Sequence, residues 1–416
     1  MVQKGDKQVT TSDRAWPLYG AAFATAVALS VCWTAMPFVL TGINGTEAHV
    51  GYALAANSLA YMVALLLTGS LLGHLNVKRA TSLATGVALS AALAMLLAVA
   101  ASRRQDGAGQ LTWIWTIICA GGLGGASMAL YWPFLMSWVS ARYEGAELNR
   151  RFGRYNGAWS GGALIGPSVG AWLVGIDPRW PMVGAVLCFG ACLVLLAFGR
   201  NGSGGQTGEA SPDEEESGPV DARLLADYRW MSRVTLFCAW ATHAILRSQF
   251  ALLFVDLGNS EAQFGLFVTT FAACNFIALT LAGRWTAWHF KPAPLIGAHA
   301  ALLAPLFMVV YGRTLPVFFA AAVVLGLAFG FAYSSHLYYG ASASRQRSVR
   351  MVIHEIVISL GITVGAGAGG YLGKNVGGYA PYWFAVILVL AGSLIQLAIH
   401  GASCFLVARR RRDANG

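Results

Sequence analysis

Long apolar runs, each close to the length that crosses a lipid bilayer, constrain this chain most strongly. Examples are 18–40, 80–100, 183–198 and 317–333. A helix of roughly twenty apolar residues spans a hydrocarbon core about 30 Å thick, whereas a soluble core would interrupt such runs with polar residues at helical spacing. Only 11% of the 416 residues are charged and 56% are hydrophobic. The chain is therefore predicted to be an all-α integral membrane protein.

Twelve spans are predicted, and one long polar segment divides them six and six. Residues 200–230 are rich in Gly, Ser, Pro and acidic residues, a composition typical of a flexible linker. The predicted domains are an N-terminal six-helix bundle (1–199), a cytoplasmic linker (200–230), a C-terminal six-helix bundle (231–408) and a basic cytoplasmic tail (409–416). The spans are placed at 17–40, 51–73, 80–101, 111–139, 153–175, 181–199, 231–256, 264–287, 293–312, 315–340, 352–373 and 381–407.

The distribution of Lys and Arg predicts the orientation. With twelve spans, 22 of the 28 basic residues fall on the face that holds both termini, five fall on the other face, and Arg247 lies inside a span. Because loops on the cytoplasmic side carry the excess of positive charge, both termini are predicted to be cytoplasmic. A bacterial inner membrane is the expected location. This asymmetry also accounts for the net charge of +10 without a nucleic-acid partner.

The two halves repeat one another. The segment "GTEAHVGY" at 45–52 matches "NSEAQFGL" at 259–266, an offset of 214 residues. At an offset of 199, three glycines of the fifth span fall on three glycines of the eleventh, and Arg151 falls on Arg350. These glycines are Gly162, Gly166 and Gly170 in the fifth span and Gly361, Gly365 and Gly369 in the eleventh. Two related six-helix halves predict a transporter body with a site between them.

Two motifs carry a family resemblance. The fifth span holds Gly153, Gly162, Gly166, Pro167 and Gly170, a series that resembles motif C of the major facilitator superfamily, although Ala171 stands where a second glycine usually ends the motif. The segment "GSLLGHLNVKR" at 69–79 resembles motif A, with Gly73 at the usual acidic position and Asn76 at the second glycine. The resemblance covers the whole chain. It implies twelve helices in two six-helix bundles and a secondary transporter, and motif C is associated with proton-coupled exporters.

The glycine series has two physical interpretations. Glycines four residues apart clear one helix face, so that a neighbouring backbone approaches closely, while Pro167 frees a carbonyl group and permits a bend. The motif residues of the fifth span and their counterparts in the eleventh are therefore predicted to serve helix packing, hinging or both. At the cytoplasmic face, four basic residues are predicted to form a gate: Lys78, Arg79, Arg151 and Arg350.

Polar groups inside spans are the candidates for substrate binding, because a charge at a helix centre costs at least about 2.5 kcal/mol unless it is paired or hydrated. Arg247 could hold an anionic substrate group; alternatively, it extends outward to water or pairs with Asp256. His243 lies one turn before Arg247, on the same helix face. The other predicted substrate-binding residues are Gln249, Tyr61, Tyr131 and Asn275.

Glu355 is the predicted proton carrier, because a partly buried carboxyl group can exchange a proton during transport. His354 and His336 are predicted to relay protons beside it. The alternative is that Glu355 is a helix-start carboxylate, stabilised by the helix dipole and by Arg350. The first span lacks an acidic residue, and Ile118 occupies the place of an arginine found in proton-driven drug exporters, so two positions of the exporter pattern are not filled.

Proton-coupled export of a small organic molecule is the first functional hypothesis. Uptake or facilitated transport of an organic anion or a sugar is the second, and a non-transporting sensor or assembly protein on the same body is the third. No catalytic residues are predicted, and no cofactor or metal is expected, because the seven cysteines lie in apolar runs without metal-ligand spacing. The expected partners are a small-molecule substrate, a proton or other coupling ion and the lipid bilayer. The protein is expected to be a monomer.

Overall fold

The computed structural model describes residues 15–71, 75–104, 107–140, 145–199, 222–342 and 347–415. Within these ranges the protein is all-helical, and twelve helical segments are long and apolar enough to cross a membrane. The prediction of an all-α membrane protein with twelve spans is confirmed. The helices are α1 (Trp16–Thr41), α2 (Glu47–Leu71), α3 (Val77–Ser102), α4 (Ala108–Ser140), α5 (Gly145–Ile176), α6 (Trp180–Phe198), α7 (Ala222–Asp256), α8 (Glu261–Arg284), α9 (Pro292–Ala301), α10 (Leu303–Tyr311), α11 (Leu315–Ala341), α12 (Arg347–Asn375) and α13 (Ala380–Asn415).

The ninth span consists of two short helices, α9 and α10, that meet at Leu302. Pro305 explains the break, because proline has no N–H to donate to the carbonyl group four residues earlier and its ring crowds that group. The N–H of Leu302 instead donates to the carbonyl oxygen of His299 at 3.1 Å. Together α9 and α10 cover one span, from Pro292 to Tyr311.

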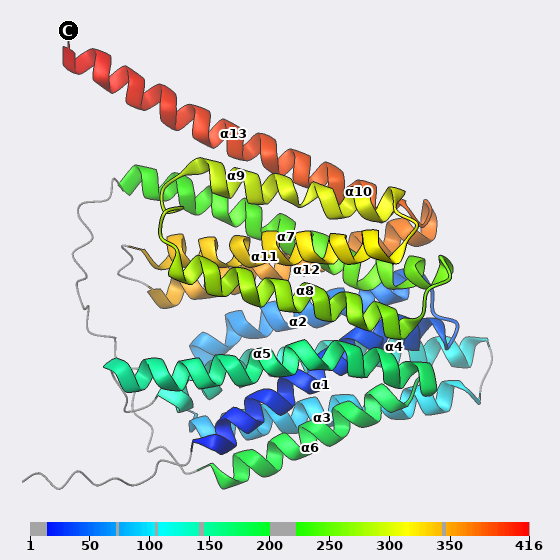
Figure 1. Ribbon diagram of the computed structural model, residues 1–416. Coiled ribbons are helices and arrows are strands. Elements are labelled where there is room, and N and C mark those ends of the chain that lie inside the picture. The colour runs from blue at the N-terminus through cyan, green and yellow to red at the C-terminus, as the bar shows by residue number, and fades with distance from the viewer. Residues whose placement is uncertain are drawn as a thin grey trace, which may run out of the picture.

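The helices form two groups, which Figure 1 shows one above the other: α1 to α6 below and α7 to α13 above. Each span reverses the chain direction, so α1 begins, α6 ends and α7 begins on the same face. We call this face, which holds Trp16, Phe198 and Ala222, the terminal face. The face that holds Thr41 and Glu47 is the opposite face.

The helix α7 begins earlier than the sequence predicted, so that residues 222–230 of the predicted linker are helical. The reason is a small aromatic and aliphatic cluster at the terminal face. Leu225 and Tyr228 of α7 are buried there against Trp288 and Tyr339, and this burial stabilises two extra helical turns. Residues 200–221 of the predicted linker lie outside the described ranges, and α13 continues as a helix through the predicted tail to Asn415.

Large apolar side chains cover much of the outer surface. Leu97, Leu187 and Leu394 each expose about two thirds of their area, at 66%, 67% and 68%. Apolar surface of this extent would drive aggregation of a water-soluble protein, whereas lipid tails solvate it. The interior combines alanines, larger aliphatic side chains and closely packed aromatic rings.

Candidate functional site

The two halves meet chiefly along two helix pairs, α2 with α12 and α5 with α8, and α7 also contacts α1 and α2. In the first pair, a Cβ atom added at Gly51 would lie 2.7 Å from the Cα atom of Gly370. In the second, a Cβ atom added at Gly265 would lie 2.6 Å from the Cβ atom of Ala171 and 2.9 Å from the carbonyl oxygen of Pro167. Both contacts lie near the opposite face, and only glycine at positions 51 and 265 permits this approach.

Glu355 lies where α12 packs on α2, on the terminal side of the Gly51 contact. The hydroxyl group of Tyr61 donates a hydrogen bond to its Oε2 atom at 3.1 Å, which joins the two halves directly. Two more tyrosines, Tyr155 of α5 and Tyr333 of α11, lie close enough to interact electrostatically with Tyr61. Phenol groups from both halves, those of Tyr61 and Tyr333, therefore lie close to Glu355.

His354 and His336 form a buried pair beside Glu355. Their Nδ1 atoms are 2.8 Å apart, so one imidazole must donate a proton and the other accept it. The ring of His354 also contacts Tyr333 edge-on at 4.7 Å, and its Nε2 atom is buried with no hydrogen-bond partner among the described residues. Tyr333 thus links the histidine pair to the surroundings of Tyr61, whereas among the described residues no hydrogen bond or ion pair joins either histidine to Glu355.

Arg247 lies toward the opposite face, where α7 meets α1. Its Nη2 atom contacts the hydroxyl group of Thr34 at 3.5 Å, across the boundary between the halves. Its Nε atom is buried and has no hydrogen-bond partner in the described part of the chain. Among the described residues the ion pairs lie elsewhere, and Arg247 does not pair with Asp256. Arg247 is therefore a half-buried cation with a buried Nε atom, and the described chain gives it no anionic partner.

The other predicted substrate-binding residues lie in different environments. His243 is stacked on Phe271 of α8, with ring centres 4.4 Å apart. Gln249 donates a hydrogen bond from Nε2 to the carbonyl oxygen of Glu47 at 3.3 Å and so links α7 to α2 near the opposite face. Tyr131 lies inside the N-terminal half, where its hydroxyl group is 3.5 Å from Cys192 Sγ. Asn275 lies inside the C-terminal half, where α8 packs on α11 at Gly330.

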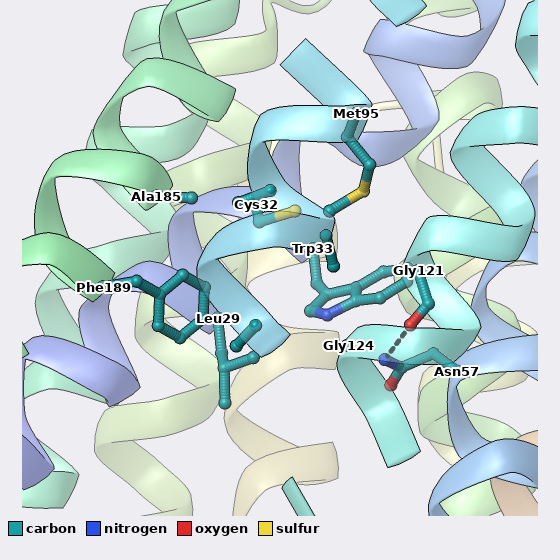
Figure 2. A pocket seen from close by; sticks show the side chains of 12 residues that line it. Leu29, Cys32, Trp33, Asn57, Met95, Gly121, Gly124, Ala185 and Phe189 are labelled. Carbon is teal, nitrogen blue, oxygen red and sulfur yellow. Dashed lines mark hydrogen bonds between the residues drawn. The ribbon is translucent and has the colours of Figure 1, made fainter. Parts of the chain in front are cut away.

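A small cavity lies inside the N-terminal half, away from the interface between the halves (Figure 2). Its lining is mostly apolar and includes Leu29, Trp33, Met95 and Phe189. Asn57 is the polar exception, and its Nδ2 atom already donates to the carbonyl oxygen of Gly121 at 2.8 Å. The cavity therefore offers a substrate little polar recognition. The described residues contain no group of three His, Cys, Asp or Glu side chains placed to hold a metal ion.

Two overlapping segments of the chain match the model of one known protein family. The model of the Major Facilitator Superfamily matches residues 18–255 and, in a second match, residues 234–414. The chain belongs to the Major Facilitator Superfamily. As a member of this superfamily it is a secondary transporter rather than an enzyme.

Solved structures of superfamily transporters have the same fold. A mutant of the nucleoside transporter NupG is 10% identical, with a TM-score of 0.67 over 92% of this chain and 99% of that chain. A bacterial homologue of the human lysosomal transporter Spinster, inward-facing and unoccupied, is 14% identical, with a TM-score of 0.66 over 94% and 97% of the two chains. Its occupied form is 11% identical, with a TM-score of 0.64 over 94% and 96%. No curated protein sequence matches this chain.

The superfamily glycines of the fifth span line its contact with the first span. A Cβ atom added at Gly162 would lie 2.6 Å from the carbonyl oxygen of Phe23, and Gly166 and Gly170 meet α1 in the same way one and two turns later. Their repeats, Gly361, Gly365 and Gly369, face α7 in the C-terminal half. Gly153 meets no neighbour within 4 Å. Both series therefore hold helices together within a half, and hinging remains a prediction.

The predicted gate residues of the terminal face are not brought together. Lys78 donates from Nζ to the carbonyl oxygens of Ala197 and Gly199, each at 2.8 Å, and so ties α3 to the end of α6. Arg79 is exposed, whereas Arg151 is buried and its Nη1 atom points to the carbonyl oxygen of Val139 at 3.5 Å. Arg350 lies in the other half, close to two further arginines, Arg229 and Arg233.

The sequence analysis did not predict Tyr155 or Thr34 as residues of the site. The internal repeat held a usable signal for Tyr155, because an offset of 199 residues places it opposite His354. Thr34 carried no such signal. Hydroxyl groups are common in membrane spans, and only the packing of α1 against α7 brings this one to Arg247.

Proposed function

We propose that this transporter exports a small organic solute in exchange for protons, with Glu355 as the proton carrier. The observation that carries the proposal is the hydrogen bond from Tyr61 to Glu355, because it places an ionisable group directly on the contact between the two halves. Export is favoured by the motif C series in α5. The proposed membrane is a bacterial inner membrane, with both termini in the cytoplasm.

Proton binding at Glu355 would change how strongly the halves hold together. An ionised carboxylate accepts a hydrogen bond from a phenol more strongly than a protonated carboxyl group does. A proton on Glu355 therefore weakens the bridge to Tyr61 and favours separation of α2 from α12 at that level. The buried pair of His336 and His354, whose member His354 contacts Tyr333, is the proposed relay of protons toward the terminal face.

The test uses inside-out membrane vesicles in which respiration acidifies the lumen. An exchanged substrate, added outside, should release luminal protons and restore the fluorescence of a trapped pH-sensitive dye. We expect Glu355→Gln to abolish this response across a panel of small organic compounds. Glu261→Gln, a matched change at the start of α8 near the opposite face, should retain it. Substrate-driven proton release that persists in Glu355→Gln would show that this carboxyl group is structural.

A second candidate function, transport of an organic anion, is favoured by Arg247. A guanidinium partly withdrawn from water is more stable when it is paired with an anion. Arg247 is half-buried, and the described chain supplies it with only a long contact to Thr34. A substrate carboxylate or phosphate would complete the site. Binding of such anions should raise the melting temperature of the purified parent protein but not that of Arg247→Ala. Equal stabilisation of both proteins by neutral or cationic compounds would argue against this candidate.

A further inference from the structure

A second feature of the C-terminal half is a cluster of four aromatic rings where α7, α8 and α11 meet. Trp240 and His243 of α7 pack against Phe271 of α8 and Phe329 of α11. The ring centres of Trp240 and Phe329 are 4.7 Å apart, those of His243 and Phe271 are 4.4 Å apart, and those of Phe271 and Phe329 are 5.2 Å apart. We call these four residues the ring cluster.

The ring cluster carries polar atoms that the described protein does not satisfy. The Nε1 atom of Trp240 is buried with no hydrogen-bond acceptor, and the Oδ1 atom of Asn275, one turn after Phe271, is buried with no donor. Oδ1 lies against Gly330, the residue that follows Phe329, where an added Cβ atom would be 2.9 Å away. Buried polar groups in native proteins are nearly always paired, so an orphaned donor and acceptor beside one cluster indicate a missing partner.

A second aromatic cluster in the same half provides a contrast. Phe250, Phe254, Phe264, Phe267 and Phe318 pack with ring centres 5.1 to 6.4 Å apart. Tyr382 also packs against Phe250, with ring centres 6.5 Å apart, and its hydroxyl group is buried without a hydrogen-bond partner among the described residues. The ring cluster differs in that an indole and an imidazole take part in it, and Asn275 places a second unsatisfied polar atom beside that of Trp240.

The position of the ring cluster along the membrane normal is also informative. Trp240 lies level with Gly361, where an added Cβ atom would be 2.9 Å from the Cβ atom of Trp240. Arg247 is seven residues further along α7, about 10 Å toward the opposite face at 1.5 Å per residue. Glu355 is six residues before Gly361 in α12, about 9 Å toward the terminal face. The ring cluster therefore occupies the level between the candidate anion site and the candidate proton carrier.

We propose that the ring cluster is a subsite for a planar aromatic or heteroaromatic ring of the substrate, which pairs its negative group with Arg247. This inference rests on the proposed transport of an organic anion and adds the class of that anion. One face of the ring stacks on the aromatic side chains, Trp240 Nε1 donates to an acceptor on the ring, and Asn275 Oδ1 accepts from a ring N–H or hydroxyl group.

The test compares two anions of similar size and equal charge, benzoate and cyclohexanecarboxylate, by calorimetric titration of the purified protein. Stacking with aromatic side chains contributes beyond simple burial, so the parent should bind benzoate about twofold to tenfold more tightly. Phe271→Leu should remove this preference while keeping the weaker affinity for both anions. Phe267→Leu makes the same change in the second aromatic cluster, around Phe250, and should keep the preference. Melting curves without ligand confirm that each variant is folded.

The unsatisfied N–H group of Trp240 is tested separately, by comparing the binding of nicotinate and benzoate. Nicotinate adds a ring nitrogen, an acceptor, to the benzoate framework, and the parent should bind it more tightly than benzoate. Trp240→Phe retains an aromatic ring but removes the N–H group, so the advantage of nicotinate should disappear.

Three results would overturn the inference or its basis. Equal binding of benzoate and cyclohexanecarboxylate to the parent overturns the ring subsite and leaves the anion site intact. Unchanged binding in Arg247→Gln, or no binding of any of the three anions to the parent, overturns the anion site and with it the ring subsite. A benzoate preference that survives in Phe271→Leu assigns the ring to another part of the protein.

Discussion

Asp177 is a carboxylate at the membrane surface that is paired with two arginines. It lies between α5 and α6 on the opposite face and accepts hydrogen bonds from Arg179 at 3.0 Å and from Arg103 at 2.8 Å. The bonds from Arg179, with the nearby Arg103, hold the pKa of its carboxyl group at about 2, below its ordinary value of 3.8. Arg103 comes from the end of α3, so the carboxylate joins two of the connections between spans.

This lowered pKa predicts a dependence of stability on pH. The folded state favours the ionised form, so the stabilisation is complete above pH 3.8 and is lost as the pH falls toward 2. We expect Asp177→Asn to lower the melting temperature by roughly 1–2 °C at pH 6, because exposed ion pairs contribute little. The difference between parent and variant should shrink between pH 4 and pH 2. A constant difference over this range would mean that the amide disturbs packing instead.

The hydrogen bond between Tyr61 and Glu355 can be measured by a double-mutant cycle. The variants are Tyr61→Phe, Glu355→Gln and the double variant, each compared with the parent by reversible denaturant unfolding at neutral pH. A hydrogen bond to a charged group contributes about 1.5–3 kcal/mol, so the two effects should not add and the coupling free energy should lie in this range. Additive effects would show that the halves do not share this bond in solution.

The sequence predicted the ionisable residues of the site but not the residues that contact them. Arg247, Glu355 and the two histidines stood out because ionisable groups are rare within spans. The contact of Tyr61 with Glu355 could not be predicted, because it depends on how far α2 and α12 slide past each other when the halves dock. That register is fixed by the approach of Gly51 to Gly370, a property of the assembled molecule.

At the scale of the helix, the two glycine series determine which pairs pack most closely. Gly166 is the test case, because an added Cβ atom would collide with the Cβ atom of Ser30 and lie 3.2 Å from the carbonyl oxygen of Val27. We expect Gly166→Ala to push α1 from α5 and to reduce the free energy of unfolding by about 1–3 kcal/mol. Denaturant unfolding of the purified protein measures this change.

The control for this prediction lies in the same helix. Gly175 meets no atom within 4 Å, so Gly175→Ala should be neutral or slightly stabilising, since alanine favours a helix more than glycine does. Equal losses in the two variants would mean that backbone propensity, and not helix approach, explains the effect.

Helix ends were the least predictable elements. The apolar runs located all twelve spans, but α7 begins at Ala222 and not near residue 231. Its first turns carry Arg223, Asp227 and Arg229 and read as polar, and they are helical because Leu225 and Tyr228 bury against residues from two other elements. Such a contact is absent from any local sequence window.

For the whole molecule, the described contacts between the halves gather toward the opposite face. Ser168 of α5 and Thr269 of α8 illustrate them, with hydroxyl oxygens 2.7 Å apart. If the halves must separate here during transport, a covalent link will stop the cycle. We expect oxidation of the Ser168→Cys/Thr269→Cys double variant to reduce substrate-driven proton release to background, and a thiol reductant to restore it.

Each single-cysteine variant, treated with the same oxidant, serves as the control and should keep its activity. Full activity of the cross-linked protein, with the link verified by mass spectrometry, would show that this face stays closed throughout the cycle.

The paired approaches of Gly51 to Gly370 and of Gly265 to Ala171 are related by the internal repeat, since offsets of 214 and 199 residues convert one contact into the other. Each half therefore carries both of the surfaces that take part in these contacts. They are marked by Gly51 and Ala171 in the first half and by Gly265 and Gly370 in the second. Two identical copies of one half could close against each other around a twofold axis by the same surfaces. In this geometry the chain resembles two subunits of a dimer joined into one polypeptide. The covalent connection ensures that one copy of each half is present, whereas the packing of the halves depends on their complementary surfaces.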